Sequence, residues 1–109
     1  MTKNTKEIRK LNDLLRTTFI TGKVMLTEGI GNLESKTREE LITKIREFKV
    51  FNKDNDPHKE HDFGAVTHNG TKAFWKIDYY DTNYEWRSED PANQRITRRV
   101  LTIMLASEY

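Results

Sequence analysis

The chain has 109 residues, of which 35% are hydrophobic and 33% charged, and its formal net charge is +2. This length allows one domain, residues 1–109, and excludes an enzyme built from separate cofactor and substrate domains. The small net charge does not indicate a general nucleic-acid or membrane binder, and the lack of cysteine excludes disulfides, thiolate metal sites and cysteine nucleophiles.

Two amphipathic helices are expected in the first half of the chain, at residues 5–19 and 37–51. In both segments an apolar residue recurs every three or four positions, as from Ile8 to Phe19 and from Leu41 to Phe48. Residues 23–27 are predicted to form a short strand between them. The N-terminal segment is polar, and no run of 18 apolar residues occurs, so we expect a cytoplasmic protein without a membrane span.

A β-hairpin is predicted around the Asn-Gly pair at residues 69–70, because this pair is preferred in type I′ turns. A two-residue turn fixes the register of the flanking strands. Gly64 is then opposite Trp75, whose ring would cover the bare backbone of the glycine. The same register places His61 opposite Asp78.

The last element is predicted to be a helix over residues 91–107, with Asp90 as its N-cap and Pro91 at the first helical position. A further short strand is expected near residues 84–86. Three helices packed on a small antiparallel sheet of three or four strands, including the Asn-Gly hairpin, define an α+β two-layer domain.

Residues 54–62 form the densest polar cluster. Histidine nitrogens and carboxylate oxygens are potential ligands of Zn²⁺ or another divalent metal, but His-x-x-His outside a helix is not a recognised ligand spacing. We favour the alternative, a solvated loop whose side chains cap its own turns, and assign no cofactor. The candidate metal ligands are His58, Glu60, His61 and Asp62.

The predicted pair of His61 and Asp78 is the catalytic candidate. A carboxylate orients a neighbouring imidazole and favours its charged form, which is half of an acid/base dyad. No nucleophile accompanies the pair, and cross-strand charge pairs commonly stabilise sheets. We therefore favour a structural role and a protein without enzymatic activity.

Residues 78–90 combine five acids and one base with several aromatic residues. Tyrosine and tryptophan are favoured at recognition surfaces, and an acidic surface complements a basic patch on a partner, including one that normally holds nucleic acid. The alternative is that half of these aromatic residues belong to the core. The candidate binding residues are Asp78, Tyr80, Asp81, Tyr84, Glu85, Trp86 and Glu89.

Arginines on the predicted last helix are candidates for contacts with phosphate. Pairing with the acids of residues 78–90, or a solvated face, is the alternative that we favour, so we do not expect direct binding of nucleic acid. The candidate residues are Arg95, Arg98 and Arg99.

Several strings, in this order, resemble a family of small uncharacterised bacterial proteins grouped as a domain of unknown function and common on plasmids and prophages. They include DNDPHKEHDFG at residues 54–64, FWKIDYYD at 74–81 and RVLTIMLASEY at 99–109. The resemblance implies no reaction, cofactor or catalytic residue. It implies a mobile-element context, in which small proteins often act on host defence.

We therefore predict a non-enzymatic module that binds a protein partner, with a host nucleic-acid-targeting defence complex as the partner that the resemblance suggests. The protein would inhibit that complex in the manner of an anti-CRISPR protein. The alternatives are a small metal-dependent enzyme using His58, His61 and Asp78, and a nucleic-acid-binding accessory protein. The sequence leaves the oligomeric state open.

Overall fold

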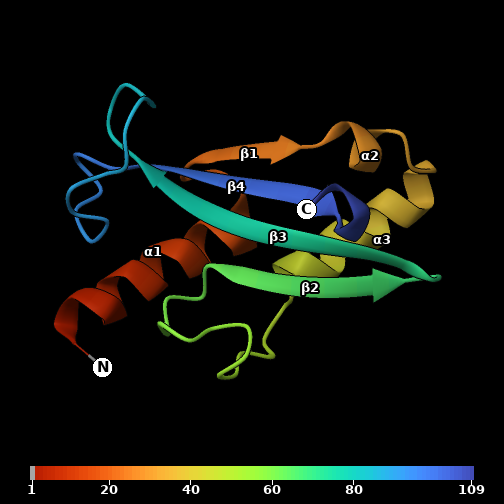
Figure 1. The fold of residues 1–109 in the computed structure, drawn as a ribbon, viewed down its shortest axis with the longest axis horizontal. Helices are drawn as coiled ribbons and strands as arrows, with labels where there is room; N and C mark the ends of the chain where they lie inside the picture. The colour runs from red at the N-terminus through yellow and green to blue at the C-terminus, as the bar shows by residue number, and fades with distance from the viewer. Residues whose placement is uncertain (1) are drawn as a thin grey trace.

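The structure is a computed structural model of the chain and describes residues 2–109. Its elements, in chain order, are α1 (Lys3–Thr18), β1 (Lys23–Leu26), α2 (Glu28–Gly31), α3 (Ser35–Arg46), β2 (Phe63–His68), β3 (Thr71–Tyr80), β4 (Arg98–Leu105) and the 3-10 turn η1 (Ala106–Glu108). The four strands form one sheet in the order β1-β4-β3-β2 (Figure 1). The sheet is mixed, because β1 runs parallel to β4 while the other neighbours are antiparallel.

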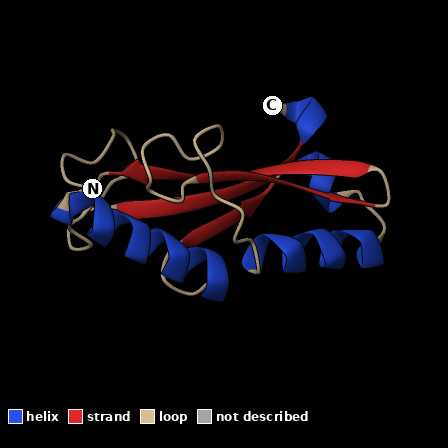
Figure 2. Ribbon diagram, turned by 90° about the horizontal axis from the view of Figure 1, so that it is seen from below, coloured by secondary structure: helices blue, strands red, loops and turns tan. Residues whose placement is uncertain are grey.

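The helices α1 and α3 cover one face of this sheet, and the turn η1 lies on its other side (Figure 2). The core fills the space between the helices and the sheet. Its fully buried side chains come from both layers and include Leu15, Leu41, Ile45, Trp75, Leu101 and Ile103. The α+β two-layer architecture expected from the sequence is therefore confirmed, with a mixed sheet in place of an antiparallel one.

The strands β2 and β3 pair in the register that the Asn-Gly pair predicts, with Gly64 opposite Trp75. A Cβ atom at Gly64 would lie 2.5 Å from Nε1 of Trp75, so the indole ring lies directly over the glycine backbone. Asn69 and Gly70 connect the two strands, and both have positive φ, at 50° and 77°. These values suit asparagine and glycine, which tolerate the left-handed region better than other residues.

The expected pairing of His61 with Asp78 is wrong. The β2–β3 ladder begins at Phe63, and the last contact before it is the bond that the Ile77 N–H donates to the Asp62 carbonyl, at 2.9 Å. His61 has a φ of 56°, which turns it out of the strand direction. Asp78 is opposite Val100 in β4, and its carboxylate forms an ion pair with Nζ of Lys76, at 2.8 Å.

The predicted helix over residues 91–107 is also wrong, because residues 98–105 form the inner strand β4. Asp90 caps a turn instead of a helix, since its carboxylate accepts a hydrogen bond from the Ala92 N–H, at 3.2 Å. Val100 and Met104 are buried on one face of the sheet, and Leu101 and Ile103 on the other. A strand buried on both faces has a continuous apolar run, which periodicity does not distinguish from a helix.

Two further expectations change with β4. Residues 84–86 lie in the connection between β3 and β4, where the nearest pairing is a single bridge between Tyr80 and Arg87. Arg99 does not face solvent, because its side chain points from β4 into the helical layer and only 2% of it is exposed. Arg99 is therefore excluded as a contact for nucleic acid, whereas Arg95 is exposed and Arg98 half-buried.

The C-terminal turn η1 is fastened to the start of α2 through the carboxylate of Glu108. This carboxylate accepts hydrogen bonds from the Thr27 hydroxyl at 2.6 Å, the Leu105 N–H at 2.8 Å and the Gly29 N–H at 3.0 Å. The bond from Thr27, followed by that from Leu105, lowers the pKa of Glu108 below its ordinary value of 4.5. The carboxylate is therefore stabilising only while it is ionised.

We expect Glu108→Gln to be less stable than the wild type near pH 7 and to approach it in acid. A carboxyl whose pKa is lowered by folding contributes stability above its unfolded value of 4.5, and this contribution is lost as the pH falls through the folded value. Urea denaturation at about pH 7 and about pH 3 measures the difference. Glu39→Gln, on the exposed face of α3, is the control. A deficit of equal size at both pH values would contradict the expectation.

Candidate functional site

The loop between α3 and β2 carries the polar cluster at residues 54–62, and its candidate metal ligands face different partners. Glu60 accepts a hydrogen bond from the Tyr79 hydroxyl, at 2.8 Å. His61 turns instead toward α1, where its Nδ1 lies 2.9 Å from a carboxylate oxygen of Asp13. Among residues 2–109, the structure places no group of three or more His, Cys, Asp or Glu side chains where it could hold a metal ion.

His61 is held by two carboxylates and a stacked aromatic ring. Its Nδ1 contacts both oxygens of Asp13, at 2.9 and 3.2 Å, and its Nε2 lies 3.6 Å from Oδ2 of Asp56. Its ring stacks on Phe51 with the centroids 3.7 Å apart and the planes 5° from parallel. The buried carboxylate of Asp56 also accepts the His61 backbone N–H, at 3.0 Å. Both ring nitrogens therefore lie near carboxylates, and the ring also borders a hollow on the surface.

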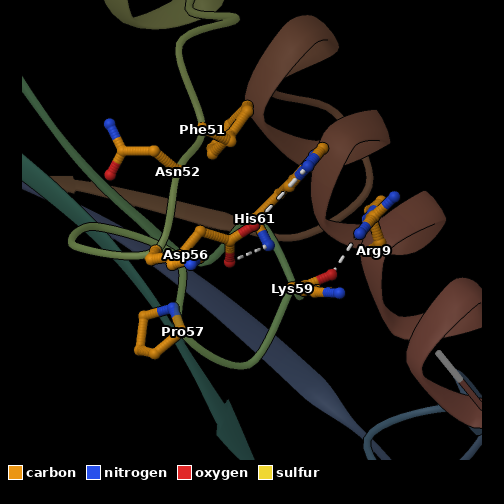
Figure 3. A pocket seen from close by; sticks show the side chains of 8 residues that line it. Arg9, Phe51, Asn52, Asp56, Pro57, Lys59 and His61 are labelled. Atoms are coloured by element: carbon orange, nitrogen blue, oxygen red, sulfur yellow. Dashed lines mark hydrogen bonds and ion pairs between the residues drawn. The ribbon is translucent and has the colours of Figure 1, made fainter.

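A hollow of about 560 Å³ lies beside this histidine (Figure 3). Arg9 reaches it from α1, and its Nε donates a hydrogen bond to the Lys59 carbonyl, at 2.9 Å. In Figure 3 Arg9 lies next to Lys59, Asp56 is central, and Pro57 is on the side of the loop away from Arg9. The lining residues are Arg9, Phe51, Asn52, Lys53, Asp56, Pro57, Lys59 and His61.

A second, smaller hollow of about 300 Å³ brings together the other metal and catalytic candidates, His58, Glu60, Asp62 and Asp78. Burial raises the pKa of Asp62 above its ordinary value of 3.8, and the nearby Glu60 raises it further. Arg87 lies over the ring of Tyr79 at the same place, with its guanidinium carbon 5.7 Å from the ring centroid. His61 is not part of this hollow. Its lining residues are His58, Glu60, Asp62, Ile77, Asp78, Tyr79 and Arg87.

Behind this hollow lies a buried polar network that the sequence did not indicate. Asn12 of α1 donates to the Tyr79 hydroxyl at 2.7 Å and to the Glu60 carbonyl at 3.1 Å, and its Oδ1 accepts a bond from Nε of Arg99, at 2.7 Å. Burial raises the pKa of Tyr79 above its ordinary value, so this hydroxyl stays protonated as a donor to Glu60. Burial also lowers the pKa of Arg99.

The acidic and aromatic residues after β3 lie at the opposite end of the sheet from η1. Trp86 is 73% exposed and Tyr84 is 44% exposed. The Tyr84 ring lies 6.4 Å from that of Tyr80, and Nζ of Lys23 lies 4.6 Å from its centroid. A hollow of about 390 Å³ opens beside Trp86, lined by Asp81, Thr82, Trp86, Arg87, Glu89 and Ile96.

The structure divides the seven candidate binding residues into groups. Asp81, Trp86 and Glu89 line the hollow beside Trp86. The rings of Tyr80, at the end of β3, and Tyr84 lie 6.4 Å apart. Glu85 is exposed in the same connection, whereas Asp78 belongs to the hollow near Glu60 and is paired with Lys76.

Fold and site together define a two-layer α+β protein with a mixed four-stranded sheet and separate hollows around its loops. The chain belongs to the family described as "Protein of unknown function (DUF3768)", whose family model matches residues 26–108. No curated protein and no solved structure matches the chain. Within residues 2–109, none of the helices has the length and apolar character needed to cross a membrane.

Proposed function

We propose that this protein is a binding module for another protein, and that its contact surface is the acidic-aromatic surface formed by Asp81, Tyr84, Glu85, Trp86, Glu89 and Ile96. The observation that carries the proposal is the 73% exposure of Trp86. A folded chain gains stability by burying an indole ring, and tryptophan is the residue most enriched at the energetic centres of protein interfaces.

The surroundings of Trp86 support this role. The hollow next to the indole ring includes the exposed Ile96, which adds apolar area for a partner to cover. Asp81 and Glu89 border the same hollow, and Glu85 is exposed nearby. Arg87 also lines this hollow, so its rim holds two acids and one base. An apolar centre with this excess of acid favours a partner that presents a basic surface around an apolar pocket.

A bacterial immunity complex that holds nucleic acid in a basic groove is a partner of this chemistry. The acidic-aromatic surface would compete with the nucleic acid for that groove, and the protein would act as an inhibitor. A mobile-element context, as implied by the resemblance noted in the sequence, favours this choice among basic partners.

We expect Trp86→Ala to weaken binding to the partner by about thirtyfold or more, because the truncation of an interface hot spot typically costs 2 kcal/mol or more. Partners are first captured from host lysate with the wild-type protein, and affinity is then measured with the purified partner. Tyr109→Ala is the matched control, since Tyr109 is similarly exposed but lies at the other end of the sheet, against Phe63 and Phe74. Equal affinities of the two variants would refute the proposed surface.

A further inference from the structure

The hollow beside His61 is built by a loop with an unusual backbone. Lys59 and His61 both have positive φ, at 60° and 56°, although neither is a glycine. Residues other than glycine keep such conformations only where the surrounding structure enforces them, and they concentrate at ligand-binding positions. Here the enforcing contacts are the bond from Arg9 to the Lys59 carbonyl and the bond from the His61 N–H to Asp56.

The charges around the hollow are unbalanced. Arg9, Lys53 and Lys59 line it, and none of these three cations forms an ion pair with any residue of the described part of the chain. The acid in the lining, Asp56, is buried and bound to His61, with one oxygen on the backbone N–H and the other 3.6 Å from Nε2. The cations therefore face the hollow without a counter-ion of their own.

The rest of the lining is suited to an organic ligand. Phe51 and Pro57 supply apolar surface, and Asn52 supplies an amide NH2 as a donor, while its Oδ1 already accepts the N–H groups of Asp54 and Asn55. The volume of about 560 Å³ falls within the range of about 300–1,000 Å³ that is usual for small-molecule sites. Arg9 is held in place by Lys59, so part of the ordering cost of binding is already met.

We propose that this hollow is a binding site for a small organic phosphate, which places its phosphate on Arg9, Lys53 and Lys59 and its apolar part on Phe51 and Pro57. A phosphate monoester carries nearly two negative charges near neutral pH and three strong acceptor oxygens. A phosphate monoester therefore matches the three cations of the hollow better than a ligand with one carboxylate group does. Arginine and lysine are the side chains that commonly bind phosphate.

Phenyl phosphate is the probe for this site, because it combines one phosphate group with one apolar ring. We expect saturable shifts of the backbone amide signals of Phe51, Lys59 and His61 in an NMR titration of the full chain. Benzoate, which keeps the ring but carries one charge, and inorganic phosphate, which lacks the ring, are expected to bind at least about tenfold more weakly.

Lys59→Glu is expected to weaken the binding of phenyl phosphate by at least about tenfold, since it replaces a cation of the site by an anion. Lys36→Glu makes the same change of charge at an exposed position of α3, away from the hollow, and should leave the affinity unchanged. The shifts of unaffected amides show that both variants are folded. An absence of saturation, an equal loss in both variants, or benzoate binding as tightly as phenyl phosphate would overturn the proposal.

Discussion

Replacing Arg99 by alanine is expected to lower the free energy of unfolding by about 2–5 kcal/mol, because a large buried side chain is truncated and the neutral acceptors that it binds lose their donor. The guanidinium donates to Oδ1 of Asn12 at 2.7 Å and to Oε1 of Gln94 at 2.8 Å, and it also donates to the Pro91 carbonyl. Its centre lies 5.2 Å from the ring centroid of Tyr79. Truncation would leave several acceptors without a donor and open a cavity between α1 and β4.

Arg98→Ala is the matched control, because Arg98 is the preceding residue of β4 and its one side-chain hydrogen bond, to the Thr97 carbonyl, is 3.5 Å long. Urea denaturation followed by circular dichroism gives both free energies. If the two variants were equally stable, the network would not hold the α1–β4 contact. Arg99→Met adds a second comparison, since methionine refills much of the cavity but leaves the same acceptors without a donor.

The continuous apolar run of β4 explains why the last element could not be predicted. The helices expected at residues 5–19 and 37–51 are present as α1 and α3, although α3 ends at Arg46, five residues earlier than expected. Their apolar residues alternate with polar ones on a helical period, as in α1 from Ile8 onward. In β4 the run from Val100 to Leu105 is apolar at almost every position. Such a run is typical of a strand buried on both faces, and the proline and aspartate before it cap a turn as readily as they begin a helix.

The contacts and the backbone conformation of His61 could not be predicted from the sequence either. Asp13, its partner, is 48 positions away on α1 and carries no local signal of the contact. The register derived from the Asn-Gly pair was right over β2 and β3. It was wrong only where it was extended beyond Phe63, the first residue of the ladder, to His61. The left-handed backbone of His61 ends that register, and a histidine in this conformation cannot be recognised from residue type alone.

For the loop that holds His61, we expect Asp56→Ala to lower the free energy of unfolding by about 2–3 kcal/mol, because it leaves a buried N–H without an acceptor. Asp56 is 5% exposed, and its Oδ1 accepts the His61 N–H at 3.0 Å. The exposed Asp54→Ala is the control.

Asp56→Asn separates the two roles of the carboxylate, since an amide oxygen still accepts the N–H but carries no charge toward Nε2, 3.6 Å away. Urea denaturation measures the stability of each variant. If Asp56→Asn keeps most of the wild-type stability, the hydrogen bond from the His61 N–H is the main contribution of Asp56. If Asp56→Asn loses as much stability as Asp56→Ala, the main contribution is the negative charge near the imidazole. A stability of Asp56→Ala equal to that of the control would show that the loop keeps His61 in its left-handed conformation without either.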